Sequence, residues 1–432
     1  MKRTVYLDHA AATPMDPRVK AAMDPYFCDI YGNPSAMYST GRAAREALDN
    51  ARASVAQVFG CTAAEIIFTG SGTESDNLAI FGVARGYGTP PLTPPRKGGE
   101  IGKQFPPLVE GRLGGVQGHI ITTTFEHHAV LNPCEALARE GYDVEFLKVD
   151  RDGLITPEQL KDAIRPETLL VSIMYANNEV GTIEPIKELT RALAEKKKEM
   201  GRKPNDPPFF HTDACQAAGY LDIDVKRLGV DLMTINGSKI YGPKGTGALY
   251  VRRGLRLKPI IYGGGQEMKL RSGTENVAGI AGLAKALEIA QQDKEKEVAR
   301  LIPLRNKLIA GIIEKITNAV PNGPSDNYSL SVARLRDWQQ KRLPNNVNVS
   351  IPGIEGEAML FYLDEAGISA SAGSACESAG PDPSHVVQAL GKSRELARSS
   401  IRFTLGRFTT QEDIDYVLEK LPEIVKKLRR LA

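Results

Sequence analysis

The sequence has little of what marks a secreted, membrane-spanning or metal-binding protein. Its 432 residues contain five scattered cysteines with no Cys-x-x-Cys pair, which argues against a disulfide framework or a zinc finger. No apolar run is long enough to cross a bilayer, and the N-terminus has no signal-peptide core. The net charge of +3 is small and gives no basis for binding nucleic acid or a membrane surface. We therefore expect a cytoplasmic protein with reduced thiols and no metal.

The length and the alternation of elements predict an α/β fold. A chain of 432 residues exceeds one ordinary core, so two domains are expected. Between residues 65 and 251, short apolar runs alternate with helical patterns, which is typical of a parallel sheet covered on both faces. A long helical stretch over 281–316 then leads into a second domain. In such sheets the functional groups gather at the carboxyl ends of the strands.

Two stretches interrupt this alternation. Residues 86–118 are rich in proline and glycine and have no apolar period, so we interpret them as a surface insert. Residues 322–344 are polar and predict a second irregular insert.

One lysine-bearing turn stands between two strand-like segments. Lys239 lies within residues 236–245, between the apolar runs 230–235 and 246–251. An amine held at a strand end beside a pocket can lose its proton and attack a carbonyl. Taken alone, such a turn is more often a hairpin loop with surface lysines. A second turn, residues 70–77, is rich in glycine and opens a helix, where free backbone N–H groups bind anions.

Several short motifs follow one another in a fixed order along the chain. They are Tyr6-Leu7-Asp8 with Ala10-Ala11, Gly32-Asn33-Pro34-Ser35, Thr73-Glu74-Ser75-Asp76-Asn77, Glu126-His127, Asn177-Asn178-Glu179, Asp213-Ala214-Cys215-Gln216, Lys239-Ile240-Tyr241-Gly242-Pro243-Lys244-Gly245, Gly263-Gly264-Gly265, Arg271-Ser272-Gly273-Thr274, Gly373-Ser374-Ala375-Cys376 and Ser400-Ile401-Arg402-Phe403. In this order they resemble the cysteine desulfurases of the NifS/IscS type, within the class V aminotransferases. The likeness covers nearly the whole chain apart from the inserts.

The resemblance implies a pyridoxal-phosphate-dependent transferase fold of type I. A large domain over 15–290 would hold a mainly parallel seven-stranded sheet covered by helices, with the insert at about 86–118. Residues 1–14 and 291–432 would form a smaller α+β domain that carries the catalytic cysteine loop.

The resemblance also assigns the residues around the cofactor ring. Lys239 matches the lysine that forms a Schiff base with pyridoxal 5′-phosphate, and Lys244 is the weaker candidate. Asp213 matches the carboxylate that keeps the ring nitrogen protonated, which makes the ring a better electron sink. His127 matches the histidine over the ring face, which serves in proton transfer. Asn178 and Gln216 match groups that hydrogen-bond to the ring hydroxyl.

The phosphate of the cofactor has its own set of predicted contacts. Gly72 and Thr73 match the cradle at a helix N-terminus, and Thr274 matches a contact that reaches in from the second subunit of a homodimer. Asn236 and Ser238 occupy two further phosphate positions, where the family usually has Ser-x-His. Ser238 can donate a hydrogen bond but is shorter than histidine and carries no charge, so we expect weaker phosphate retention.

The reaction that the resemblance implies removes sulfur from L-cysteine. Arg402, with Asn178, would bind the substrate carboxylate through its bidentate fork. Cys376 would attack the substrate sulfur, so that alanine leaves and Cys376 carries a persulfide. A sulfur-acceptor protein, such as an iron–sulfur scaffold or a tRNA-thiolation enzyme, would then take the sulfur.

Two alternatives remain open from the sequence. The same scaffold supports a selenocysteine lyase or another class V aminotransferase, which does not need Cys376. A catalytically silent scaffold that binds sulfur-carrier partners is the second alternative, and it would lack the visible absorbance of a bound cofactor.

Overall fold

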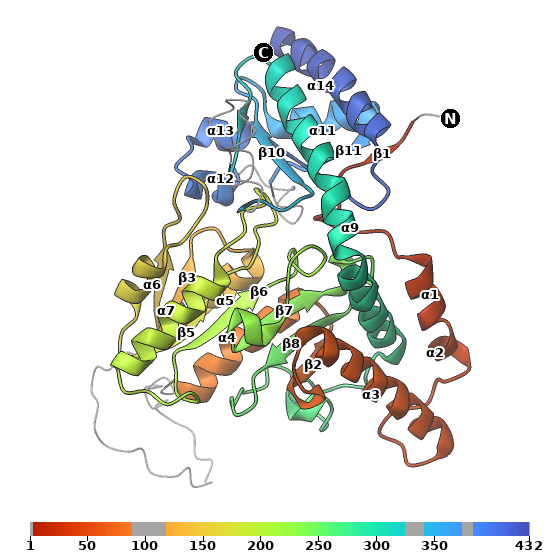
Figure 1. Ribbon diagram of the computed structural model, residues 1–432, viewed down its shortest axis with the longest axis vertical. Coiled ribbons are helices and arrows are strands. Elements are labelled where there is room, and N and C mark those ends of the chain that lie inside the picture. The colour runs from red at the N-terminus through yellow and green to blue at the C-terminus, as the bar shows by residue number, and fades with distance from the viewer. Residues whose placement is uncertain (1–2, 89–117, 325–340, 374–382, 432) are drawn as a thin grey trace, which may run out of the picture.

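A mixed sheet forms the centre of the larger part of the molecule (Figure 1). The computed structural model describes residues 3–88, 118–324, 341–373 and 383–431. The strands of the sheet are β2 (Ile66–Thr69), β3 (His119–Thr123), β4 (Asp143–Leu147), β5 (Thr168–Ser172), β6 (Phe209–Asp213), β7 (Leu232–Asn236) and β8 (Gly247–Val251). They lie in the order β2-β8-β7-β6-β5-β3-β4, and all neighbours are parallel except β8, which is antiparallel to β7 and β2. The predicted seven-stranded, mainly parallel sheet is confirmed.

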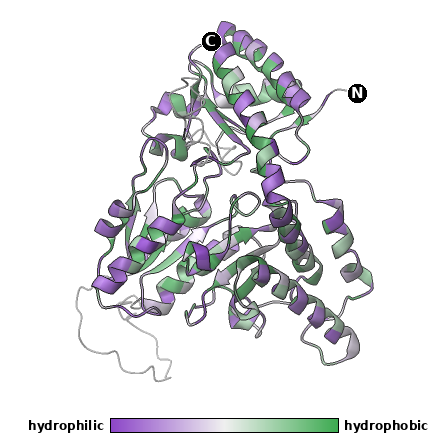
Figure 2. Cartoon of the chain, in the orientation of Figure 1, coloured by the Kyte–Doolittle hydropathy of each residue, from purple (hydrophilic) through white to green (hydrophobic). Residues whose placement is uncertain are grey.

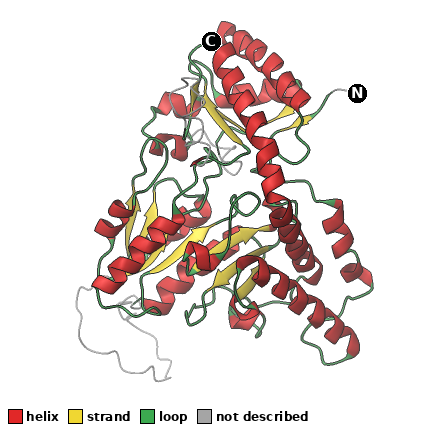
Figure 3. Cartoon of the chain, viewed as in Figure 1, coloured by secondary structure: helices red, strands yellow, loops and turns green. Residues whose placement is uncertain are grey.

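Helices cover both faces of this sheet (Figure 3). The helices of this part are α1 (Pro17–Met23), α2 (Pro25–Cys28), α3 (Ser39–Phe59), α4 (Gly72–Tyr87), α5 (His128–Arg139), α6 (Pro157–Ala163), α7 (Ile186–Glu199) and α8 (Val225–Leu228), with single turns η1 (Ala63–Glu65), η2 (Gly237–Lys239) and η3 (Glu267–Lys269). Successive strand residues point to opposite faces. Accordingly Met233 packs in the core beneath α3 and α7, whereas Leu232 packs beneath α4 and α5.

A smaller part has its own sheet and its own core. Strands β9 (Val320–Pro321), β10 (Asn346–Ser350) and β12 (Ser400–Thr404) form a three-stranded antiparallel sheet, and β1 (Val5–Tyr6) pairs with β11 (Ile368–Ser369). Its helices are α11 (Gly356–Glu365), α12 (His385–Ala389), α13 (Arg394–Arg398) and α14 (Gln411–Leu431). The apolar stripe of α14, visible in Figure 2, packs into this second core.

One helix connects the two cores. Helix α9 (Val277–Lys315) has 39 residues and runs from beside the large sheet into the smaller part (Figure 1). Its residues Leu283 and Leu287 pack in the first core, whereas Leu301 and Leu308 pack in the second. The change of core therefore falls between residues 287 and 301 of a continuous helix.

The boundaries of the predicted inserts need one correction. Helix α4 continues through Tyr87, so the first residues of the predicted insert 86–118 are helical. Residues 89–117, and 325–340 of the second insert, lie outside the described residues.

A buried ion pair ties the turn η3 to α3 and β2. Arg52 donates to both carboxylate oxygens of Glu267, at 2.6 and 2.8 Å, and their side chains are 9% and 2% exposed. Glu267 also accepts a hydrogen bond from the backbone N–H of Phe68 at 2.8 Å, and Arg52 donates to the carbonyl of Ile66 at 2.6 Å. Because both charges are buried, neither can be lost without leaving the other uncompensated.

We predict that Arg52→Met lowers the free energy of unfolding by about 3–5 kcal/mol, because it strands the Glu267 carboxylate in the interior. The double variant Arg52→Met/Glu267→Met should recover part of that loss. Urea unfolding of the two variants and the wild type provides the measurement. A loss below about 1 kcal/mol for the single variant, the range of an exposed pair, would contradict the prediction.

Candidate active site

A pocket of about 200 Å³ lies at the carboxyl ends of the parallel strands. Asp213 is the last residue of β6, and Lys239 follows β7 in the turn η2. His127 caps the N-terminus of α5, just after β3. Crossover connections place successive loops at this same edge of a parallel sheet. The predicted residues that line the pocket are Gly72, Thr73, His127, Asn178, Asp213, Gln216, Asn236, Lys239 and Arg402.

The N-terminus of α4 lies at the pocket, which Gly72 and Thr73 line. The Ser71 side chain caps the helix by accepting from Glu74 N at 3.1 Å. A Cβ at Gly72 would lie 2.7 Å from Cys215 Sγ, so only glycine fits this close approach. The helix N-terminus carries a partial positive charge and outward N–H groups, which suit a phosphate.

Backbone carbonyls of the N-terminal segment hold the Lys239 amine. Its Nζ donates to the carbonyl oxygens of Ala10 and Ala11, at 2.8 and 2.6 Å. Gln216 Nε2 donates to the same Ala10 oxygen at 3.0 Å. Both carbonyl oxygens belong to one short backbone segment, so they hold the amine in a defined position. The amine therefore lies at the pocket that Lys239 lines.

Burial shifts the pKa values of two polar groups near Asp213. Asp213 Oδ1 itself accepts from the backbone N–H of Cys215 at 2.8 Å. Burial, and then the nearby Asp213 charge, raise the pKa of Asp76 well above its usual value. Burial lowers the pKa of His211 to about 4, and its Nε2 lies 3.5 Å from Asp76 Oδ1. Both shifts favour the uncharged form of the group.

The His127 ring is oriented by its own helix. Its Nδ1 accepts from Ala129 N at 3.1 Å, which leaves Nε2 as the nitrogen that carries the proton in the neutral ring. Burial is the main cause that lowers the pKa of His127. A neutral imidazole is suited to lie against an aromatic face.

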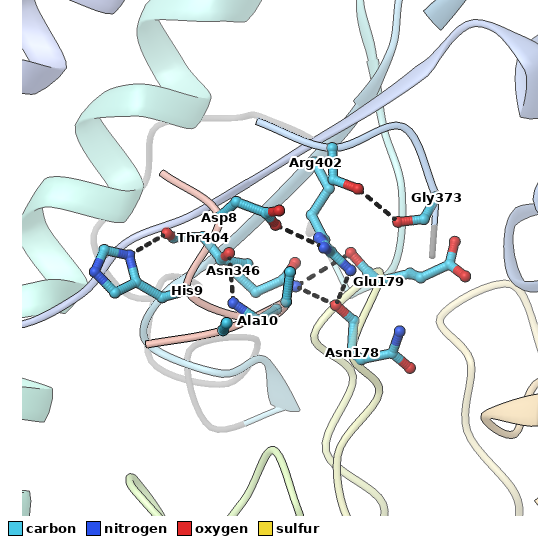
Figure 4. A network of polar contacts seen from close by, with 12 residues as sticks. Asp8, His9, Ala10, Asn178, Glu179, Asn346, Gly373, Arg402 and Thr404 are labelled. Atoms are coloured by element: carbon cyan, nitrogen blue, oxygen red, sulfur yellow. Dashed lines mark hydrogen bonds and ion pairs between the residues drawn. The ribbon is translucent and has the colours of Figure 1, made fainter. Parts of the chain in front are cut away.

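Arg402 connects the pocket to the N-terminal segment (Figure 4). Its Nη2 lies 2.7 Å from Asp8 Oδ1, and its Nη1 donates to the carbonyl oxygen of Asn178 at 3.1 Å. The Asn178–Glu179 peptide region is held from β10 as well, by Asn346 Nδ2, which donates to Glu179 O at 3.1 Å. The Arg402 side chain is only 1% exposed. These contacts therefore hold the Arg402 guanidinium in a fixed orientation.

Two buried polar atoms at the pocket point to a missing ligand. Within the described part of the chain, Arg402 Nε and Asn178 Oδ1 have no hydrogen-bond partner. A buried donor and a buried acceptor left unsatisfied are costly. A ligand carboxylate would accept a hydrogen bond from Arg402 Nε, and a ligand hydroxyl would donate one to Asn178 Oδ1. Together with the amine, the aspartate and the helix N-terminus, these groups fit pyridoxal phosphate and an amino-acid substrate.

Two predicted residues lie outside the pocket lining, and a third falls outside the described residues. Ser238 Oγ donates to Asn236 Oδ1 at 3.2 Å and does not line the pocket. Thr274 is exposed on the segment after η3 and also lies outside the lining. Cys376 falls outside the described residues, although Ser371, shortly before it, exchanges backbone hydrogen bonds with Arg402 at 2.6 and 3.1 Å.

The structure adds residues for which the sequence predicted no role. Asp8, Ala10 and Ala11 contact the two cations of the site, and Asp76 lines the pocket. All four residues stand within the motifs quoted above, which is the only sequence signal that could have found them. Nothing in an alanine side chain indicates that its carbonyl is used.

The described residues contain neither a metal-binding cluster nor a membrane-spanning helix. No group of three or more His, Cys, Asp or Glu side chains among these residues could hold a metal ion. None of the helices in the described ranges has the length and apolar character needed to span a membrane.

Comparisons with known proteins agree with this geometry. The family model for aminotransferase class-V matches residues 5–91 and 112–417. The cysteine desulfurase IscS of Dictyoglomus turgidum is 44% identical over 432 residues, covering 100% of this chain and 97% of that protein. The solved NifS-like protein of Rickettsia africae is 30% identical, with a TM-score of 0.77, covering 98% of this chain and 100% of that one.

A further solved structure, "SspA in complex with cysteine", is 32% identical with a TM-score of 0.70 and covers 94% of this chain and 100% of that chain. The predicted family resemblance and fold class are therefore confirmed. The chain belongs to the class-V aminotransferase family of pyridoxal-phosphate enzymes, with IscS and NifS-like proteins among its relatives.

Proposed function

We propose that this protein is a cysteine desulfurase that converts L-cysteine to L-alanine and carries the sulfur as a persulfide on Cys376. The observation that carries the proposal is that Lys239, Asp213 and Arg402 line one pocket. Their amine, carboxylate and guanidinium groups are the types needed to hold the cofactor ring and to bind an α-amino acid.

Lys239, Asp213 and Arg402 have separate tasks in this proposal. Bound pyridoxal phosphate supplies an electron sink for the substrate's Cα. Arg402 binds the substrate carboxylate, and Asn178 lies beside it. Lys239 accepts the Cα proton, and His127 provides a second proton-transfer group at the pocket.

Cys376 provides the sulfur-accepting step. Its thiolate attacks the substrate sulfur, so that an S–S bond forms while the Cβ–S bond breaks and its electrons go to the carbon that becomes the alanine methyl group. Ser371, shortly before Cys376 in the sequence, exchanges backbone hydrogen bonds with Arg402. This contact supports the proposal that the Cys376 thiol reaches the end of the pocket where Arg402 binds the substrate carboxylate. The persulfide then passes to an acceptor protein, for which an iron–sulfur scaffold and a tRNA-thiolation enzyme both remain open.

The proposal includes a homodimer in the cytoplasm. Thr274 is exposed and does not line the pocket of its own chain, which supports a role at the partner's phosphate. On the same segment, Tyr262 is 79% exposed and Met268 is 46% exposed, as expected of residues that a second copy would cover.

Alanine formed from cysteine without a keto acid would distinguish the proposed desulfurase function from that of an aminotransferase.

We predict that borohydride reduction of the holoenzyme leaves a pyridoxyl group on Lys239, because this amine, and not that of Lys244, lies at the pocket. Peptide mass spectrometry locates the adduct. Lys239→Ala should abolish it, and the matched control Lys244→Ala should retain it. An adduct found only on Lys244 would contradict the assignment.

We predict that Cys376→Ser keeps the visible absorbance of the bound cofactor but stops sulfide release from L-cysteine in the presence of a thiol reductant. The cofactor is held by other residues, whereas the serine hydroxyl cannot accept sulfur. The exposed Cys28 provides the control, since Cys28→Ser should release sulfide at the wild-type rate. Wild-type sulfide release by Cys376→Ser would rule out the persulfide role.

We predict that Ser238→His slows cofactor dissociation by about 10-fold, as expected for one added hydrogen bond to a charged group. Absorbance after dilution into a cofactor trap measures the rate. Ser238→Ala tests whether a change in packing alone has this effect. An unchanged rate in Ser238→His would mean that this position does not reach the phosphate.

A further inference from the structure

The residue two places after Lys239 has an unusual backbone conformation. Tyr241 has a φ of 63°, in the left-handed region that bulky side chains rarely occupy. Glycine adopts this region without strain, and Gly242 is the very next residue. Strain of this kind persists only where the surrounding structure holds the residue in place.

The N-terminal segment holds the backbone of this turn on both sides of the lysine. Tyr241 N donates to Thr13 Oγ1 at 2.8 Å, and Tyr241 O accepts from Asp16 N at 3.0 Å. Before the lysine, Ser238 O accepts from both Thr13 N at 2.9 Å and Thr13 Oγ1 at 3.0 Å. The peptide that carries Lys239 is therefore fixed from both ends.

The Tyr241 side chain extends these contacts to the smaller part of the molecule. Its hydroxyl oxygen accepts from the backbone N–H of Arg407 at 2.6 Å, and the Arg407 guanidinium lies 4.5 Å from its ring centroid. Arg407 also pairs with Asp16. Arg407 follows closely on β12, the strand that carries Arg402. Glycine at position 241 would remove the strain but also both contacts that the Tyr241 side chain makes with Arg407.

We propose that Tyr241 is a positioning residue that fixes the separation between Lys239 and Arg402. This inference rests on the proposed function, which assigns Lys239 to the amine end of an α-amino acid and Arg402 to its carboxylate end. A ligand that must satisfy both ends at once loses affinity when their separation is no longer fixed. A ligand that lacks the carboxylate does not use Arg402 and is insensitive to that separation.

The test compares two ligands that differ only in the carboxylate. The visible absorbance of the holoenzyme is titrated with L-alanine and, separately, with ethylamine, and the ratio of the two association constants is the readout. Tyr241→Phe removes the acceptor for Arg407 N and should lower this ratio by about 3- to 10-fold, the range of one hydrogen bond. Tyr241→Gly should lower it further.

Two further variants calibrate the ratio. Arg402→Gln should lower it as well, because this removes the carboxylate contact itself. The buried Tyr250 on β8 is the matched control, and Tyr250→Phe should leave the ratio unchanged. Only protein loaded with cofactor contributes to the absorbance, so a partly unfolded fraction of a variant does not enter the ratio.

Equal weakening of both ligands in Tyr241→Phe would overturn the inference, because a merely structural role predicts that result. An unchanged ratio would overturn it too. A wild-type holoenzyme that responds to neither ligand would instead contradict the proposed function, and this inference would fail with it.

Discussion

The contact between the N-terminal segment and the two cations of the pocket is the constraint on which the site depends. Ala10 and Ala11 accept from the Lys239 amine, while Asp8 pairs with Arg402. Lys239 lies in η2, just after β7 of the large sheet, whereas Arg402 lies on β12 of the small one. A short segment near the start of the chain therefore fixes groups from both parts, although Lys239 and Arg402 are more than 150 residues apart in the sequence.

The strand β1 explains why this segment can do so. It pairs with β11 in the smaller part, and the chain then passes along the pocket before α1 packs against α9 in the large part. Backbone carbonyls are used because the segment crosses the pocket in an irregular conformation, with acceptors that no sheet partner occupies. Helix α9 also runs from one part into the other, so the two parts are joined by two separate connections.

Burial controls the charge around the proposed ring position. It raises the pKa of Glu126 to about 8 and that of Asp76 well above its usual value, and it lowers the pKa of His211 to about 4. These shifts favour the uncharged forms of all three groups, which lie in the buried surroundings of Asp213. An ion pair with a protonated ring nitrogen is stronger in such surroundings because the local dielectric constant is low.

The sequence alone determined the α/β class and the family, because periodicity of 2 and 3.6 residues and ordered motifs are local properties. Through the resemblance it also implied the seven-stranded sheet and nine of the residues that line the pocket. It correctly placed Asp213 and Lys239 at strand ends. It did not determine that the pKa of Asp76 is raised, that Ala10 and Ala11 bind the lysine or that Tyr241 is strained. Each of these depends on contacts between segments distant in sequence, since pKa values, carbonyl acceptors and backbone strain are set by the folded surroundings and not by residue type.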